Sequence, residues 1–167
     1  MGFKFNSKTL GIGLACCVLF GVFAIAVPAQ SGPSVGDQID LSSFRNRKGR
    51  SLAEALQQHS VALLVLVDPG CASCVTTKDS LAALRQRVGL TRIAYYVVII
   101  SDGSDTQKCF DFADSLKLEA ESFVWSNHEV KAPASLLTMT KPSHLQVTPE
   151  GLVVEKWLGT PAKDATP

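Results

Sequence analysis

A chain of 167 residues has room for one ordinary domain. Its formal net charge is +1, from 16 basic and 15 acidic residues, so it lacks the basic field that binds a nucleic-acid backbone. With 46% hydrophobic and only 19% charged residues, the chain is too apolar to stay disordered. These values exclude a multidomain enzyme, a nucleic-acid-binding protein and a disordered protein.

The first residues resemble a membrane-targeting segment. Residues 1–9 contain Lys4, Lys8 and no acidic residue, and residues 10–27 (LGIGLACCVLFGVFAIAV) carry no charge. A basic stretch before an apolar run is typical of a secretory signal or a signal anchor. The small residues at 27–29 permit cleavage before Gln30, so both a cleaved signal and an uncleaved apolar helix remain open. In either case the lysines favour the cytoplasmic side, which predicts that the rest of the chain is exported.

The composition divides the chain into four parts. Residues 1–29 are the signal peptide or membrane anchor, and residues 30–34 are a short linker of small and polar residues. We expect one folded domain over residues 35–163 and a tail over 164–167. The predicted location of the domain is therefore the periplasm or the extracytoplasmic face of a membrane.

Within the domain, buried strands alternate with helices. Ser51 and Glu54 have the spacing of a capping box, which predicts a helix from there to about Gln58. The other expected elements, in chain order, are an extended segment at 35–41, strands at 61–67 and 93–100, helices at 71–88 and 106–116, a short strand at 122–126, an ambiguous helical segment at 129–139, and strands at 143–147 and 152–157. The last two strands flank a hairpin turn at 148–151. This alternation predicts an α/β fold with a central mixed sheet flanked by helices.

The motif that carries chemistry is Cys71-Ala72-Ser73-Cys74. A zinc site would need a second close pair of ligands, which the sequence lacks, and haem attachment would need histidine where Val75 stands. A purely structural disulfide would close a tight loop. The pair instead follows a buried strand and a short turn and opens a helix, a context that favours a redox dithiol.

The position of the two cysteines assigns them different roles. Cys71 lies at a helix N-terminus, where free N–H groups and the helix dipole favour its thiolate. Cys74 lies one turn further into the helix and is expected to be more buried. This arrangement predicts that Cys71 attacks a substrate disulfide and that Cys74 then resolves the mixed disulfide.

Three segments resemble a known family. The stretch 61–74 (VALLVLVDPGCASC) is similar to the active-site segment of thioredoxin-fold proteins. The stretch 142–159, with a proline, a strand, a turn and glycines, is similar to the cis-proline segment of TlpA/ResA-like thiol–disulfide oxidoreductases. The segment 35–52 (VGDQIDL and, later, GRSL) also resembles the first strand of this AhpC/TSA-like redoxin group. The resemblance implies a thioredoxin-like fold over about residues 35–163.

The resemblance also implies a site and partners. It makes Cys71 and Cys74 the catalytic pair, and makes Pro142 the cis-proline of a loop that receives the extended backbone of a partner polypeptide. Lys141, which precedes this proline, would favour a thiolate if it faced Cys71. The implied partners are exported proteins with cysteines or disulfides and a membrane electron donor or acceptor. No cofactor and no resident metal are implied.

The sequence departs from the family pattern in three places. Gly70 stands where the family usually has tryptophan, and Val65 stands where thioredoxins keep a buried aspartate that helps to deprotonate the second cysteine. The dipeptide 72–73 is typical of neither strong reductants nor strong oxidants. The direction of electron flow is therefore left open.

Two further residues have competing interpretations. Cys109 shares one helix face with apolar residues, so a buried, inert thiol is favoured over a third redox cysteine. His144 lies in the strand after Pro142, where it either faces solvent or approaches the dithiol.

Two alternative functions remain open for the domain. One is a peroxiredoxin-like peroxidase, and the other is a copper-binding module that would use the two CxxC cysteines, with His144 as an optional further ligand.

Overall fold

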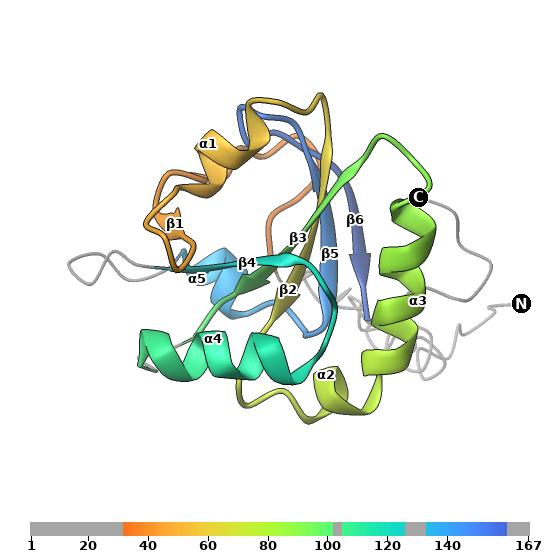
Figure 1. Ribbon diagram of the computed structural model, residues 1–167. Coiled ribbons are helices and arrows are strands. Elements are labelled where there is room, and N and C mark those ends of the chain that lie inside the picture. Colours follow the sequence, from red (N-terminus) through yellow and green to blue (C-terminus); the bar gives the residue numbers. More distant parts are fainter. Residues whose placement is uncertain (1–31, 102–104, 126–132, 160–167) are drawn as a thin grey trace, which may run out of the picture.

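The computed structural model describes residues 32–101, 105–125 and 133–159, in which one six-stranded mixed sheet carries helices on both faces (Figure 1). The spatial order of the strands is β1-β4-β3-β2-β5-β6. Their bounds are Phe44–Arg45 for β1, Ala62–Val67 for β2, Ala94–Ile99 for β3, Glu121–Trp125 for β4, Ser143–Val147 for β5 and Val153–Leu158 for β6.

The centre of the sheet is β2, which pairs in parallel with β3 and antiparallel with β5. Every residue of β2 is buried, as expected of a strand covered on both faces. The strand β4 continues the parallel part beside β3, and β6 pairs antiparallel with β5 at one edge. The predicted α/β class, with a central mixed sheet and an antiparallel last pair of strands, is confirmed.

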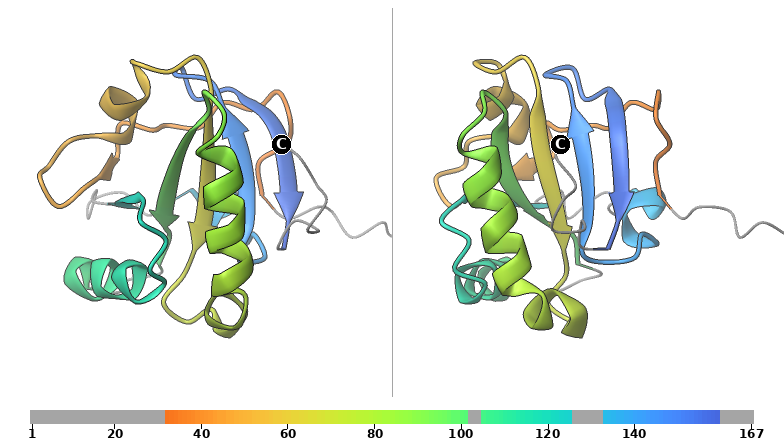
Figure 2. Two further views of the ribbon diagram at one scale, coloured as in Figure 1. Left: turned by 45° about the vertical axis from the view of Figure 1, so that its right-hand side comes forward. Right: turned by 90° about the vertical axis from the view of Figure 1, so that its right-hand side faces the viewer.

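The helices divide between the two faces of the sheet (Figure 2). The short helices α1 (Leu52–Leu56) and α5 (Ala134–Leu137) pack on the face formed by Leu64, Leu66 and Leu145. The helices α2 (Ala72–Thr76), α3 (Lys78–Val88) and α4 (Thr106–Ser115) cover the opposite face. Each face therefore buries its own apolar cluster, and the second cluster includes one of the two CxxC cysteines.

Helix α1 begins at the predicted capping box. The Ser51 hydroxyl accepts a hydrogen bond from the Glu54 N–H at 3.1 Å, and the Glu54 carboxylate accepts one from the Ser51 N–H at 2.9 Å. These two bonds satisfy donors that the first turn of a helix leaves free. The helix ends at Leu56, slightly before the predicted end.

The helix predicted over residues 71–88 is wrong as a single element, because Thr77 divides it into α2 and α3. The Thr77 N–H and hydroxyl both donate to the carbonyl of Ser73, at 3.0 and 2.7 Å. Thr76 donates its hydroxyl to the same carbonyl at 3.1 Å. Such side-chain hydrogen bonds compete with the regular helical pattern. The apolar periodicity of the segment does not reveal them.

The predicted turn between β5 and β6 is confirmed, and its backbone also forms a hydrogen bond with the extended segment near residue 39. Thr148 and Gly151 form the hairpin bonds, with Thr148 N–H donating to the Leu152 carbonyl at 3.0 Å. The Gly151 carbonyl accepts from the Ile39 N–H at 2.9 Å. Gly151 has a φ of +88°, and a Cβ atom there would lie 2.2 Å from the Ile39 carbonyl oxygen. Both the backbone conformation and the close approach require glycine.

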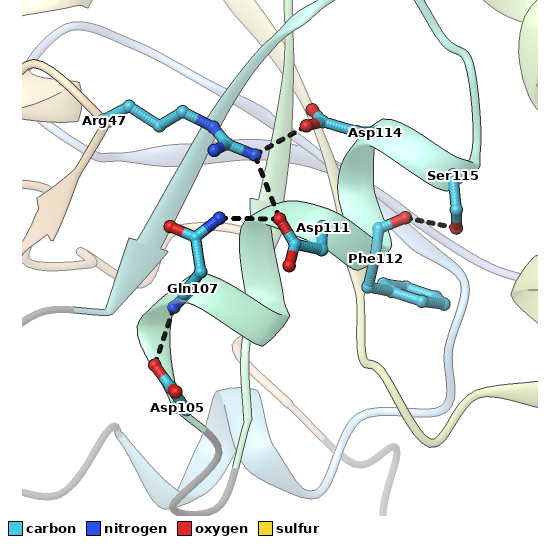
Figure 3. Close-up of polar contacts among 7 residues, drawn as sticks. All are labelled: Arg47, Asp105, Gln107, Asp111, Phe112, Asp114 and Ser115. Carbon is cyan, nitrogen blue, oxygen red and sulfur yellow. Dashed lines mark hydrogen bonds and ion pairs between the residues drawn. The ribbon is translucent and has the colours of Figure 1, made fainter.

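The strand β1 was not predicted from the sequence. It has two residues, Phe44 and Arg45, which pair with Trp125 and Val124 of β4. The loop after β1 reaches α4, where the Arg47 guanidinium lies 2.6 Å from the Asp114 carboxylate and 3.7 Å from that of Asp111 (Figure 3). These ion pairs are exposed, so they add little stability.

Some predicted segments fall outside the described residues. These are the apolar helix of residues 1–29, part of the turn at 101–105, residues 129–132 of the ambiguous segment, and the end of the domain with its tail after residue 159. Over the three described ranges, none of the helices has both the length and the apolar character needed to cross a membrane.

Candidate active site

The CxxC pair lies directly after the central strand, at the end of a short turn. The turn begins at Asp68, whose carboxylate accepts from the Gly70 N–H at 2.7 Å and whose carbonyl accepts from the Cys71 N–H at 2.9 Å. Cys71 is the N-cap residue of α2. The structure joins Cys71 and Cys74 in a disulfide, with the two Cα atoms 5.3 Å apart.

The two cysteines differ in exposure. Cys71 is half-buried, whereas the exposed fraction of Cys74 is 0%. The Cys71 sulfur accepts a hydrogen bond from the Cys74 N–H at 3.0 Å. A backbone donor at this position stabilises a thiolate once the disulfide is reduced. An accessible, stabilised sulfur beside a buried one is the arrangement that a nucleophile and a resolving thiol require.

The Pro142 segment lies against the CxxC motif, although the two are far apart in sequence. The Lys141–Pro142 peptide bond is cis, as the family resemblance implies, and Pro142 is buried. The Ser73 hydroxyl donates to the Lys141 carbonyl at 2.7 Å and lies 3.3 Å from the Cys71 sulfur. Ser73 therefore links the motif to the proline loop, a role that its sequence position did not reveal.

The Lys141 ammonium is directed to α5. It donates to the carbonyls of Leu136, Leu137 and Met139 at 3.3, 2.9 and 3.0 Å. Burial lowers the pKa of Lys141, and the negative charge of Asp68 offsets this shift in part. The side chain therefore binds the carbonyls at the C-terminal end of a helix, a common use of lysine. The suggested attraction to the Cys71 thiolate has no hydrogen bond to support it among the described residues.

Two residues with competing interpretations are both buried. Cys109 has an exposed fraction of 0% in the cluster under α4, and burial raises the pKa of its thiol, as expected of an inert cysteine. His144 also has an exposed fraction of 0%, so the interpretation as a solvent-facing strand residue is wrong. It pairs directly with Val65 of β2 and with Trp157 of β6.

Candidate metal ligands were compared over the part of the chain that the structure describes. There, no group of three or more His, Cys, Asp or Glu side chains is placed to hold a metal ion.

Comparison with known proteins rests on structure alone, because no protein-family model and no curated protein matches the sequence. The thioredoxin domain of a thiol-disulfide oxidoreductase from Bacteroides vulgatus aligns with a TM-score of 0.56 and 21% identity, over 77% of this chain and 89% of that one. A thiol:disulfide interchange protein from Bacteroides sp. aligns with a TM-score of 0.59 and 19% identity, over 76% and 83%. StoA from Bacillus subtilis aligns with a TM-score of 0.56 and 14% identity, over 79% and 95%. The thioredoxin-like fold predicted from the sequence is confirmed.

Proposed function

We propose that this chain is an exported, membrane-tethered thiol–disulfide oxidoreductase that exchanges disulfides with cysteine-containing exported proteins. The observation that carries the proposal is the disulfide-bonded pair Cys71–Cys74 lying against the Lys141–Pro142 loop on a thioredoxin fold. The names of two structural relatives support the same chemistry: one is a thiol-disulfide oxidoreductase and the other a thiol:disulfide interchange protein.

In the reducing direction, the exchange has two steps. The Cys71 thiolate attacks one sulfur of a partner disulfide, forms a mixed disulfide and releases the partner's other sulfur as a thiolate. Cys74 then loses its proton and attacks the Cys71 sulfur, which closes the Cys71–Cys74 disulfide and releases the second partner thiolate. Two electrons pass from the CxxC pair to the partner. The reverse sequence oxidises a partner dithiol.

The proline loop would hold the partner beside the half-exposed sulfur. By resemblance to the family, the backbone around Lys141 and Pro142 receives an extended segment of the partner polypeptide. The Lys141 carbonyl already accepts the Ser73 hydroxyl, which places that carbonyl at the Cys71 side of the loop. A partner segment bound there would bring its disulfide to Cys71.

Export and tethering rest on the N-terminal sequence. Lys4 and Lys8 precede an uncharged run at residues 10–27, which is the pattern of a signal or an anchor. One structural relative is described as a secreted disulfide oxidoreductase from Mycobacterium tuberculosis. At that location the electrons would come from, or go to, a donor or acceptor in the membrane.

The exchange reaction is tested by trapping. Replacing Cys74 with Ser removes the resolving thiol, so mixed disulfides between Cys71 and exported proteins should accumulate and disappear on reduction with dithiothreitol. Cys71→Ser should trap nothing, because the nucleophile is lost, and Cys109→Ser should behave like the unchanged chain, because that thiol is buried. The proposal fails if Cys74→Ser traps no partner and the unchanged chain does not interconvert between dithiol and disulfide.

The tether is tested separately. Alkaline phosphatase fused after residue 167 should be active when the full chain precedes it and inactive when the fusion begins at residue 30, because the enzyme folds only after export. After cell fractionation, the full chain should be recovered with the membranes. A mature protein that begins at Gln30 and is released from the membrane would exclude the tether while leaving export in place.

A further inference from the structure

A buried histidine lies on β5, beside the strand that leads to the CxxC pair, and has no role in the two exchange steps. His144 follows Pro142 by two residues in β5, and its exposed fraction is 0%. Neither ring nitrogen finds a hydrogen-bond partner of ordinary geometry among the residues that the structure describes. Buried polar groups in proteins are nearly always paired, so an unpaired imidazole in the core calls for an explanation.

Strand register places His144 on the same side of the sheet as Cys74. His144 pairs directly with Val65, and residues directly opposite in an antiparallel pair point to the same face, with Cβ atoms about 5 Å apart. Val65 belongs to the buried cluster that contains Cys74, whose exposed fraction is also 0%. His144 and the resolving cysteine thus share one water-poor layer between the sheet and the helices α2 and α3.

The surroundings keep the imidazole neutral. Burial lowers the pKa of His144 to about 4, and the backbone of Gly159 offsets this shift only in part. The facing residues Val65 and Trp157 carry no charge. At neutral pH one ring nitrogen therefore carries a lone pair, and burial lets the ring hold a proton only while a negative thiolate lies beside it.

Charged groups lie at the margins of this layer. Asp68 and Lys141 lie at the CxxC end of the sheet, and the negative charge of Asp68 acts both on Lys141 and on the buried Cys109 thiol. On β6, exposed Glu155 precedes Trp157 by two residues, and on α3 the Arg85 guanidinium lies 5.6 Å from the centre of the Tyr95 ring. His144 thus lies on the Cys74 side of the sheet, between paired side chains that carry no charge.

We propose that His144 is the base that takes the Cys74 thiol proton as Cys74 attacks the mixed disulfide on Cys71. This inference rests on the proposed oxidoreductase function and names a residue for one of its steps. In thioredoxins a buried aspartate helps to deprotonate the second cysteine, and this chain has Val65 at that position. His144, which pairs with Val65, would take over that role from the neighbouring strand β5.

The Cys74 S–H bond breaks and its proton moves to a ring nitrogen of His144, while the Cys74 sulfur bonds to the Cys71 sulfur and the Cys71–partner bond breaks. The partner leaves as a thiolate with the electron pair of the broken bond, and His144 then returns its proton to that thiolate or to solvent. During the transfer a neutral pair becomes an ion pair, so the buried layer gains no net charge.

The step can be isolated with the chromogenic disulfide dithiobis(nitrobenzoate) and the reduced full chain in detergent, with Cys16 and Cys17 replaced by Ser. The first coloured thiolate reports attack by Cys71, and the second reports attack by Cys74. With His144→Leu, the first release should keep its rate, and the second should slow about a hundredfold at neutral pH, the effect of losing a general base. The deficit should shrink in alkali, because hydroxide then deprotonates Cys74. His59→Leu, the same change at another histidine, should alter neither release.

Three results would overturn the proposal. The first is that the second release keeps its rate in His144→Leu. The second is that both releases slow equally at every pH, because an equal effect would indicate a structural role. If His144→Leu does not fold, His144→Gln replaces it, and the His144 ring is titrated by NMR in the unchanged chain. A titration that is identical in the oxidised and reduced protein would show that the ring does not sense the thiols. A chain that releases one coloured thiolate and never the second would instead refute the proposed function itself.

Discussion

Acid should destabilise the oxidised protein over a pH range set by His144. The unfolded chain binds a proton on this ring near the ordinary pKa of 6.5, whereas burial lowers the pKa in the folded protein to about 4. Between these two values the unfolded state binds more protons than the folded state. Stability therefore rises with pH across the range and is lost as the pH falls through it.

The size of the effect follows from the two pKa values. Each pKa unit corresponds to about 1.4 kcal/mol, so the full difference between 6.5 and about 4 amounts to about 3 kcal/mol. About 2 kcal/mol of this should already be lost at about pH 5. Asp40, Glu54 and Glu150 also have lowered pKa values, but their ordinary values, 3.8 for the aspartate and 4.5 for the glutamates, confine their contributions to more acidic conditions. The range from about pH 7 to about pH 5 therefore isolates the histidine.

The assay is urea unfolding of the oxidised full chain in detergent at the two pH values, with the free energy of unfolding extrapolated to zero denaturant. Oxidation removes Cys71 and Cys74 from the titration. The matched variant is His144→Leu, which has no titrating group at this position and should lose little stability between the two pH values. His59→Leu should retain the acid sensitivity of the unchanged chain.

An unfolding free energy that stays constant from about pH 7 to about pH 5 would refute the buried, neutral state of His144. So would an equal loss in the unchanged chain and in His144→Leu, because the responsible group would then lie elsewhere. A ring that titrates near 6.5 in the oxidised protein, measured by NMR, would contradict the same reasoning directly.

Two further predictions concern the turn and the proline loop. Gly151→Ala should lower the free energy of unfolding by more than about 2 kcal/mol, because it adds a left-handed alanine and a clash with the Ile39 carbonyl. Gly49→Ala, where φ is +79° but the space is open, should cost only about 1 kcal/mol, and equal losses in urea unfolding would contradict this explanation. Lys141→Met should leave the pH dependence of Cys71 alkylation in the reduced protein unchanged, because the ammonium binds carbonyls of α5. A higher apparent pKa of Cys71 in this variant would instead show that the lysine acts on the thiolate.

Local signals accounted for most of the predicted elements. The strands β2 and β3 are continuous apolar runs between turn residues, and the capping box of Ser51 and Glu54 marks the start of α1. The break at Thr77 and the two-residue strand β1 were missed. The break depends on the hydrogen bond of the Thr77 hydroxyl, and β1 depends on its pairing with β4. Neither interaction leaves a periodic pattern in the sequence.

The sequence by itself determined which residues are candidates for the chemistry. A CxxC motif after a buried strand and a proline before a strand, turn and glycine are short-range patterns, and their spacing is sufficient to identify Cys71, Cys74 and Pro142 as candidates. Tertiary structure decided what surrounds them. The contact of Ser73 with the Lys141 carbonyl and the burial of His144 opposite Val65 depend on β5 pairing with β2, across about half of the chain. Pairing register sets which face each side chain joins, and register is a property of the assembled sheet rather than of either segment alone.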